Sequence, residues 1–131
     1  MKLYKVEKFG TLLVVRCCLE GVEGKAYPKL LVDTGSTYTI ISYEILETIE
    51  TIGCSPTIPK RRQRIVTASG YEIVPVVTVD KVHCLGKLIE NKEILAHTLQ
   101  FGAYVDGLLG MDFLTAFKIE IKPYAGEIVV Q

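Results

Sequence analysis

The sequence has no tryptophan, no long apolar run and no net charge. Its 131 residues include 15 basic and 15 acidic side chains, so no excess positive charge indicates a nucleic-acid partner. The longest apolar runs, Leu12 to Val15 and Leu30 to Val32, are far too short to span a bilayer. The N-terminus carries scattered charges and lacks the apolar segment of a signal peptide. We therefore expect a soluble, cytoplasmic protein with no nucleic-acid or membrane partner.

Metal-binding patterns are also missing. No C-x-x-C spacing occurs among the four cysteines, which are Cys17, Cys18, Cys54 and Cys84. A zinc site is therefore poorly supported. His83 and Cys84 with His97 could be combined into a ligand set, but isolated His and Cys residues in strands are usually packed or surface residues. We expect neither a metal nor a cofactor.

What is present is a chain that is 49% hydrophobic and long enough for one domain with its own core. Short β-rich segments separated by turn residues predict strands at 3–9, 11–19, 25–32, 39–41, 82–89, 93–99, 118–121 and 127–130. The pair 82–89 and 93–99 is expected to turn at Asn91, and short helices are expected from Ser42 to Ile52 and from Met111 to Phe117. This pattern predicts a single closed all-β domain over residues 1–131.

A hairpin is predicted from Arg61 to Val79, with its turn at Ala68, Ser69 and Gly70. The basic run from Lys60 to Arg64 precedes it. We interpret this run as a solvated loop in preference to a patch that steers substrate.

The stretch LLVDTGST, Leu30 to Thr37, raises the question of function. An apolar strand that ends at a carboxylate is unusual, because a buried charge is costly unless it is compensated. Hydrolysis of a peptide without metal, Cys or Ser needs one group to deprotonate water and another to protonate the carbonyl oxygen. The chain has one Asp-Thr-Gly, so a symmetric dimer would supply the second carboxylate from Asp33 of another copy.

LLVDTGST together with VDGLLGMDFL, residues 105–114, resembles the retropepsin-like aspartic proteases, specifically their cellular and bacterial single-domain members. The resemblance covers nearly the whole chain in order: terminal strand, catalytic loop, hairpin, two apolar residues with a glycine, helix and terminal strand. It implies a retropepsin-like β-barrel and a homodimer, with the apolar chain ends helping to hold the two copies together.

The resemblance also implies roles for individual residues. Asp33 would be the catalytic carboxylate, and Thr34 would form a hydrogen bond across the dimer. Gly35 would let backbone N–H groups approach the carboxylates. Ser36 would either donate to the outer carboxylate oxygen or cap the turn.

The remaining implied roles belong to the hairpin and to the substrate cleft. Ala68, Ser69 and Gly70 would form the tip of a flap that closes over substrate. The residues expected to line or back the cleft are Ile73, Val76, Leu108, Leu109 and Gly110.

Some positions depart from the family pattern. Thr37 and Met111 occupy places where the family often has charged residues that brace the dimer, and Asp112 is a candidate for another bracing role. Asp106 precedes a glycine but lacks a following Thr, so we interpret it as a turn or cleft-rim residue.

The function expected on these grounds is an aspartic endopeptidase that cleaves extended, hydrophobic peptide segments. Two alternatives stay open. One is a retropepsin-like domain used for dimerisation or peptide binding, with little activity. The other is a ligand-binding β-barrel in which Asp33 only caps a turn.

Overall fold

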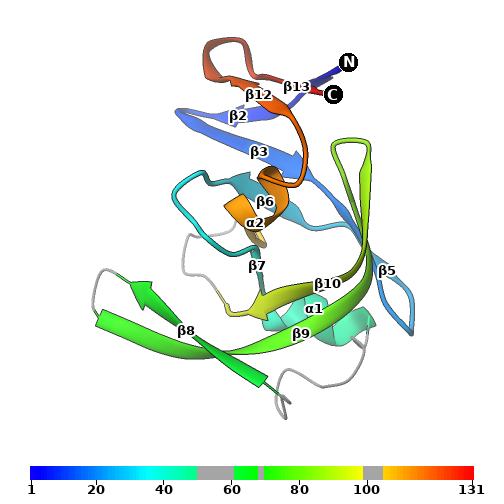
Figure 1. Ribbon diagram of the computed structural model, residues 1–131, viewed down its shortest axis with the longest axis vertical. Helices are drawn as coiled ribbons and strands as arrows, with labels where there is room; N and C mark the ends of the chain where they lie inside the picture. Colours follow the sequence, from blue (N-terminus) through cyan, green and yellow to red (C-terminus); the bar gives the residue numbers. More distant parts are fainter. Residues whose placement is uncertain (50–60, 68–69, 99–104) are drawn as a thin grey trace.

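The computed structural model describes residues 1–49, 61–67, 70–98 and 105–131 (Figure 1). Most of the described chain is strand: β1 (Lys2–Lys5), β2 (Glu7–Phe9), β3 (Leu12–Arg16), β4 (Cys18–Glu20), β5 (Lys25–Ala26), β6 (Lys29–Val32), β7 (Ile40–Ile41), β8 (Arg61–Thr67), β9 (Gly70–Cys84), β10 (Lys87–Ala96), β11 (Gly107–Leu109), β12 (Ile119–Lys122) and β13 (Glu127–Val130). The helices are α1 (Tyr43–Ile49), α2 (Met111–Leu114) and the short 3-10 helix η1 (Pro123–Ala125). The predicted all-β class is confirmed.

The larger sheet has the strand order β2-β3-β6-β11-β7-β10-β9-β4-β5, with β8 paired to β9. Its end strands, β2 and β5, do not pair with each other among the described residues, so the expectation of a closed barrel is corrected to a strongly curved open sheet. Among the described residues each end strand is paired along one edge, β2 with β3 and β5 with β4.

The smaller sheet contains both ends of the chain. β13 lies in the centre, paired antiparallel with β1 on one side and with β12 on the other. Lys2 pairs with Val130, so the two termini lie side by side (Figure 1). Ile128 and Val130 are buried, which makes the C-terminal strand part of this chain's own core and not a free edge.

The hairpin of β9 and β10 is the longest feature of the fold, and its turn differs from the prediction. The chain reverses at Leu85 and Gly86, which have φ of 52° and 71°. Both residues have the positive φ that a tight two-residue hairpin turn requires. Asn91 also has positive φ, but it lies within β10 and not at a turn. Leucine rarely adopts a positive φ, so the sequence gives no sign of a turn at Leu85. This is why the turn was expected at Asn91.

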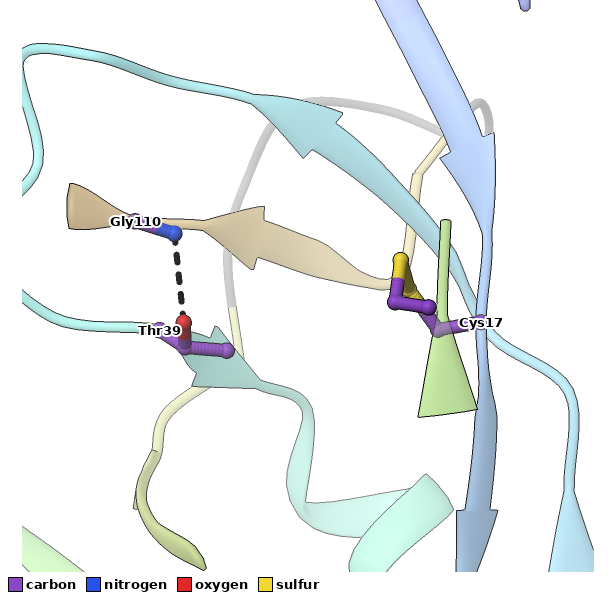
Figure 2. The surroundings of a disulfide bond; sticks show 4 residues. Cys17, Thr39 and Gly110 are labelled. Carbon is purple, nitrogen blue, oxygen red and sulfur yellow. Dashed lines mark hydrogen bonds between the residues drawn. A yellow bond between two sulfur atoms is a disulfide. The ribbon is translucent and has the colours of Figure 1, made fainter. Parts of the chain in front are cut away.

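The predicted strand 11–19 is interrupted at Cys17, where β3 ends and β4 follows. Cys17 forms a disulfide with Cys84 at the end of β9, and the two Cα atoms are 4.7 Å apart (Figure 2). Both cysteines are almost fully buried, whereas Cys18 is a partly exposed free thiol. The disulfide therefore ties the β3–β4 junction to the β9–β10 hairpin, a link that the sequence analysis did not predict.

The described residues form two apolar clusters. The main core lies between the two sheets and the helices, and it includes Leu46 and Ile49 of α1 and Phe113 of α2. We call the second one the hairpin cluster; its buried members are Ile40, Val74, Val76, Leu95 and Leu108. No helix in the described parts of the chain is long and apolar enough to cross a membrane.

Candidate active site

Three short strands that are far apart in the sequence form the floor of the site. β11 lies between β6, to which it is parallel, and β7, to which it is antiparallel. The chain from Asp33 to Thr39 leaves β6, passes around β11 and enters β7. The D-T-G-S stretch and the L-L-G stretch are therefore neighbours in space, although more than seventy residues separate them.

Asp33 is half-buried at the end of β6, and backbone hydrogen bonds fix its position. Its N–H donates to the carbonyl of Leu109 at 3.0 Å, which extends the β6–β11 ladder by one residue. The Gly35 N–H donates to the Asp33 carboxylate at 2.9 Å, and the Ser36 N–H donates to the Asp33 carbonyl at 3.2 Å. The turn thus presents a carboxylate that already accepts one backbone N–H.

Two glycines are in close contact with their surroundings at this site, and at Gly110 the contact leaves no room for a side chain. A Cβ on Gly110 would collide with the backbone carbonyl of Tyr38. A Cβ on Gly35 would lie 3.2 Å from the Asp33 carboxylate oxygen, tighter than most side chains accept. The glycine of L-L-G therefore lets two loops pack backbone to backbone, and the glycine of D-T-G leaves room beside the carboxylate.

Ser36 and Thr34 behave differently in this single chain. The Ser36 hydroxyl donates to the carbonyl of Tyr38 at 2.7 Å, so its one proton is not directed at Asp33. Of the two alternatives for Ser36, the geometry favours the turn. Thr34 is exposed at the surface of the loop.

The hairpin cluster lies on the same side of the sheet as Asp33. Leu108 pairs in register with Leu31 and with Ile40, and all three contact the hairpin cluster or belong to it. Asp33 follows Leu31 by two residues, so strand alternation puts its side chain on this side. The carboxylate therefore stands at the edge of an apolar surface covered by the base of the β8–β9 hairpin.

The five residues expected at the cleft do not all share this surface. Val76 and Leu108 belong to the hairpin cluster, and buried Gly110 lies behind the Asp33 loop. Leu109 points the other way, into the main core, where it is fully buried.

Ile73 is also separated from the expected set, because it lies on the outer face of β9 and is 61% exposed. Residues 73 and 76 are an odd number of positions apart, so a regular strand directs them to opposite faces. Val74 takes the place expected for Ile73. This residue was missed, although the two-residue period of the strand could have found it.

The predicted hairpin is present as the antiparallel pair β8–β9, in which Arg61 pairs with Val76 and Thr67 with Gly70. Gly70 has a φ of 132°, while Ala68 and Ser69 lie outside the described residues. At the base of the hairpin Arg61 pairs with Glu93 at 2.6 Å. Nearer the tip, Nε2 of His97 lies 3.0 Å from the carboxylate of Glu72.

The basic run is not the loop that we expected. Its residues from Arg61 to Arg64 form the first part of β8, and Arg64 lies over the ring of Tyr71 on the outer face of the hairpin. Lys60 lies outside the described residues.

Asp106 is placed at the other end of the β6–β11 pair. Its carboxylate accepts the Lys29 N–H at 2.9 Å, and its own N–H donates to the Lys29 carbonyl at 2.7 Å. Asp33 lies four residues further along β6, a distance of about 13 Å at the rise of a strand. Asp106 therefore holds the start of β6 through the backbone of Lys29, and at this distance it cannot share a proton with Asp33 in the same chain.

Asp112 is bound more closely to the site than the sequence could show. Its carboxylate accepts the Thr39 hydroxyl at 2.7 Å and the Lys92 ammonium at 2.8 Å. Neither Thr39 nor Lys92 was singled out from the sequence. No cluster of three or more His, Cys, Asp or Glu side chains within the described ranges is arranged to hold a metal ion.

Comparison with known proteins agrees with this arrangement. The family described as gag-polyprotein putative aspartyl protease matches residues 21–116, and the chain therefore belongs to this retropepsin-like family. The fold is similar to the crystal structure of a retropepsin-like aspartic protease from Rickettsia conorii, with a TM-score of 0.71 and 20% identity over 98% of this chain and 91% of that one. At this identity the likeness establishes the shared fold. Comparison with curated protein sequences finds no match.

Proposed function

We propose that the protein is an aspartic endopeptidase that acts as a homodimer, with Asp33 of each copy forming the catalytic pair. The observation that carries the proposal is the placement of Asp33. It ends an apolar strand, accepts the Gly35 N–H at 2.9 Å and stands beside an apolar surface covered by a hairpin. A carboxylate that only capped a turn would not need this surface beside it.

The dimer follows from the number of carboxylates. Acid–base hydrolysis needs two, and Asp106 lies at the far end of the strand pair from Asp33. A two-fold axis beside the Asp33–Gly35 loop would bring the second carboxylate from a partner. The exposed Thr34 would then be placed to form its hydrogen bond across the interface.

In this mechanism the carboxylate pair holds one proton and a water molecule. The ionised carboxylate takes a proton from the water molecule, and the water oxygen attacks the scissile carbonyl carbon. The protonated carboxylate gives its proton to the carbonyl oxygen. The carboxylate that took the water proton then gives it to the amide nitrogen, and the other carboxylate takes a proton from a hydroxyl of the tetrahedral intermediate. The C–N bond breaks, which releases a carboxylic acid and an amine and leaves the pair with one proton again.

The surface next to Asp33 suggests the substrate class. Leu31, Ile40 and Leu108 on the floor, with Val74 and Val76 on the hairpin, would contact apolar side chains of a peptide. An extended peptide would lie between floor and hairpin and form backbone hydrogen bonds as an added strand. These contacts require the hairpin to lift, because the cluster is buried in the present conformation.

The test is cleavage of a peptide library from acid to neutral pH by the wild-type protein and by Asp33→Asn. The amide is nearly isosteric but cannot act as a general base, so turnover should be lost while the fold and the dimer persist. Cleavage by purified Asp33→Asn would refute the role of Asp33. A wild-type protein that binds a statine-type transition-state mimic but cleaves no peptide would indicate the alternative, a peptide-binding domain with little activity.

A further inference from the structure

A chain of three polar contacts connects β10 to the turn behind Asp33. The Lys92 ammonium donates to Oδ2 of Asp112 at 2.8 Å, and the Thr39 hydroxyl donates to Oδ1 of the same carboxylate at 2.7 Å. The Gly110 N–H donates to the Thr39 hydroxyl oxygen at 3.2 Å. The dashed line in Figure 2 marks this hydrogen bond. We call these residues the Lys92–Gly110 relay.

The Lys92–Asp112 ion pair is less exposed to water than the other ion pairs among the described residues. Thr39 is 2% exposed, and the side chains of Lys92 and Asp112 are 15% and 21% exposed. Both partners in the Arg61–Glu93 pair are more than half exposed. Water and salt weaken an exposed pair, whereas a shielded, hydrogen-bonded pair keeps more of its attraction.

Asp112 accepts one hydrogen bond at each of its two carboxylate oxygens. The Gly110 N–H occupies an acceptor site of the Thr39 hydroxyl, so the single hydroxyl proton is available for Asp112. An ionised carboxylate is the best acceptor for that proton. Lys92 is the cation that balances this partly buried charge, which would otherwise be costly.

Asp112 also holds the catalytic loop through its backbone. Its N–H donates to the Thr37 carbonyl at 3.1 Å, and the adjacent Met111 N–H donates to the Ser36 carbonyl at 2.7 Å. Backbone and side chain of the 110–112 segment thus contact the loop at 36, 37 and 39. That loop begins at Asp33, whose own N–H is bound to Leu109.

We propose that Lys92 is a positioning residue for the Asp33 carboxylate, acting through Asp112 and Thr39. This inference rests on the proposed function. Removing the Lys92 charge leaves the Asp112 carboxylate without its cation, so the carboxylate turns toward water and releases the Thr39 hydroxyl. The loop then loses the side-chain contact that holds it at 39, and Asp33 loses its fixed geometry relative to its partner.

A cavity beside the relay makes a conservative rescue possible. It has a volume of about 220 Å³ and is lined by Tyr38, Thr39, Arg61, Val76, Lys92 and Asp112, among others. The longer side chain of Lys92→Arg can enter this space and still present an N–H to Asp112. Lys92→Met keeps most of the apolar stem and removes only the charge.

The experiment compares Lys92→Met, Lys92→Arg, Asp112→Asn and the double variant Lys92→Met/Asp112→Asn on one cleaved peptide. Misplacement of a catalytic group lowers kcat more than it changes KM. We expect about a tenfold loss of kcat for Lys92→Met, near-normal kcat for Lys92→Arg, and a double variant no worse than its poorer single variant. Lys87→Met is the matched control, because Lys87 is on the same strand and lies over the Phe117 ring.

A second readout separates this inference from the proposed function. Lys92→Met should shift the backbone amide NMR signals of Asp33, Gly35 and Gly110, whereas Lys87→Met should not. If wild-type protein cleaves nothing, the proposed function fails, while these signals still report whether Lys92 positions the loop. Unchanged loop signals in Lys92→Met, or a Lys92→Arg variant that folds and dimerises yet stays as slow as Lys92→Met, would overturn the inference.

Discussion

Asp33 and Leu109 are joined backbone to backbone, with the Asp33 N–H donating to the Leu109 carbonyl at 3.0 Å. This bond continues the parallel pairing of Val32 with Leu109. The position of the Asp33 carboxylate is therefore set both by β11 and by the D-T-G turn itself. Substitutions in the L-L-G segment should therefore alter the position of the Asp33 carboxylate.

Gly110→Ala tests the closest approach in this region. The added methyl group would collide with the Tyr38 carbonyl, and backbone cannot move aside as a flexible side chain can. We expect a loss of about 3 kcal/mol in the free energy of unfolding, measured with urea. Gly10→Ala is the control, since nothing lies within 4 Å of its added Cβ and only its φ of 61° opposes alanine, at about 1 kcal/mol. Equal losses for the two variants would contradict the close approach.

Ser36→Ala tests which group receives the serine proton. The hydroxyl donates to the Tyr38 carbonyl at 2.7 Å, so its removal should lower the free energy of unfolding by about 1 kcal/mol. The acid limb of the pH profile of kcat/KM should stay where it is in the wild type. A shift of that limb to higher pH would mean that Ser36 donates to the catalytic pair in the dimer.

The outer face of the small sheet offers a test of the dimer. Leu3 pairs with Val129 there, is 48% exposed and borders a hollow of about 550 Å³ that Glu120 and Gln131 also line. If the chain ends hold the dimer, Leu3→Lys should shift sedimentation toward monomer and reduce cleavage in proportion.

Val22→Lys is the control for this variant, because Val22 is an exposed apolar residue in the turn after β4. Deletion of residues 127–131 would be a poorer test, since β13 is the central strand of the small sheet and its loss would disturb the monomer. A Leu3→Lys protein that stays dimeric at the lowest measurable concentration would exclude this face from the interface.

The disulfide should contribute to stability independently of the site. Cys17 and Cys84 are 67 residues apart in sequence, and a cross-link over a loop of that size typically stabilises a fold by about 2–4 kcal/mol. Cys17→Ser/Cys84→Ser should lose this amount in urea unfolding without reductant, and Cys18→Ser should lose much less. Identical unfolding curves for wild-type protein with and without a reducing agent would show that the bond does not form in solution.

Local patterns predicted much of the fold, including the elements around Asp33. The apolar strand into Asp33, the glycine at 110 and the hairpin that starts at Arg61 each have a signal in neighbouring residues, and the structure has these elements. Ile73 lies apart from Val76 for a local reason, because alternation along β9 directs Val74 and not Ile73 to the face of Val76.

Other features have no local signal. The Thr39–Asp112 bond joins residues 73 positions apart, and Lys92 reaches Asp112 from a different strand. Four cysteines allow several pairings, so spacing alone does not select Cys17 with Cys84. Such contacts join residues that are distant in the sequence, so they can be found only once the arrangement of all the strands is known.

The pairing of β9 has a mechanical consequence. From Val76 to Cys84 the strand is supported by β10, and near its end also by β4, whereas from Gly70 to Pro75 its described backbone partner is β8 alone. The outer part is thus a two-stranded ribbon that extends from a multi-stranded sheet. The change from one to the other lies at Val76, which pairs with Leu95 of β10. A two-stranded ribbon is much softer than the sheet it leaves. Bending near Val76 would uncover the surface beside Asp33, while the other end of β9 stays fixed by the disulfide at Cys84. The stiffness of the ribbon would then govern how fast a peptide enters and leaves.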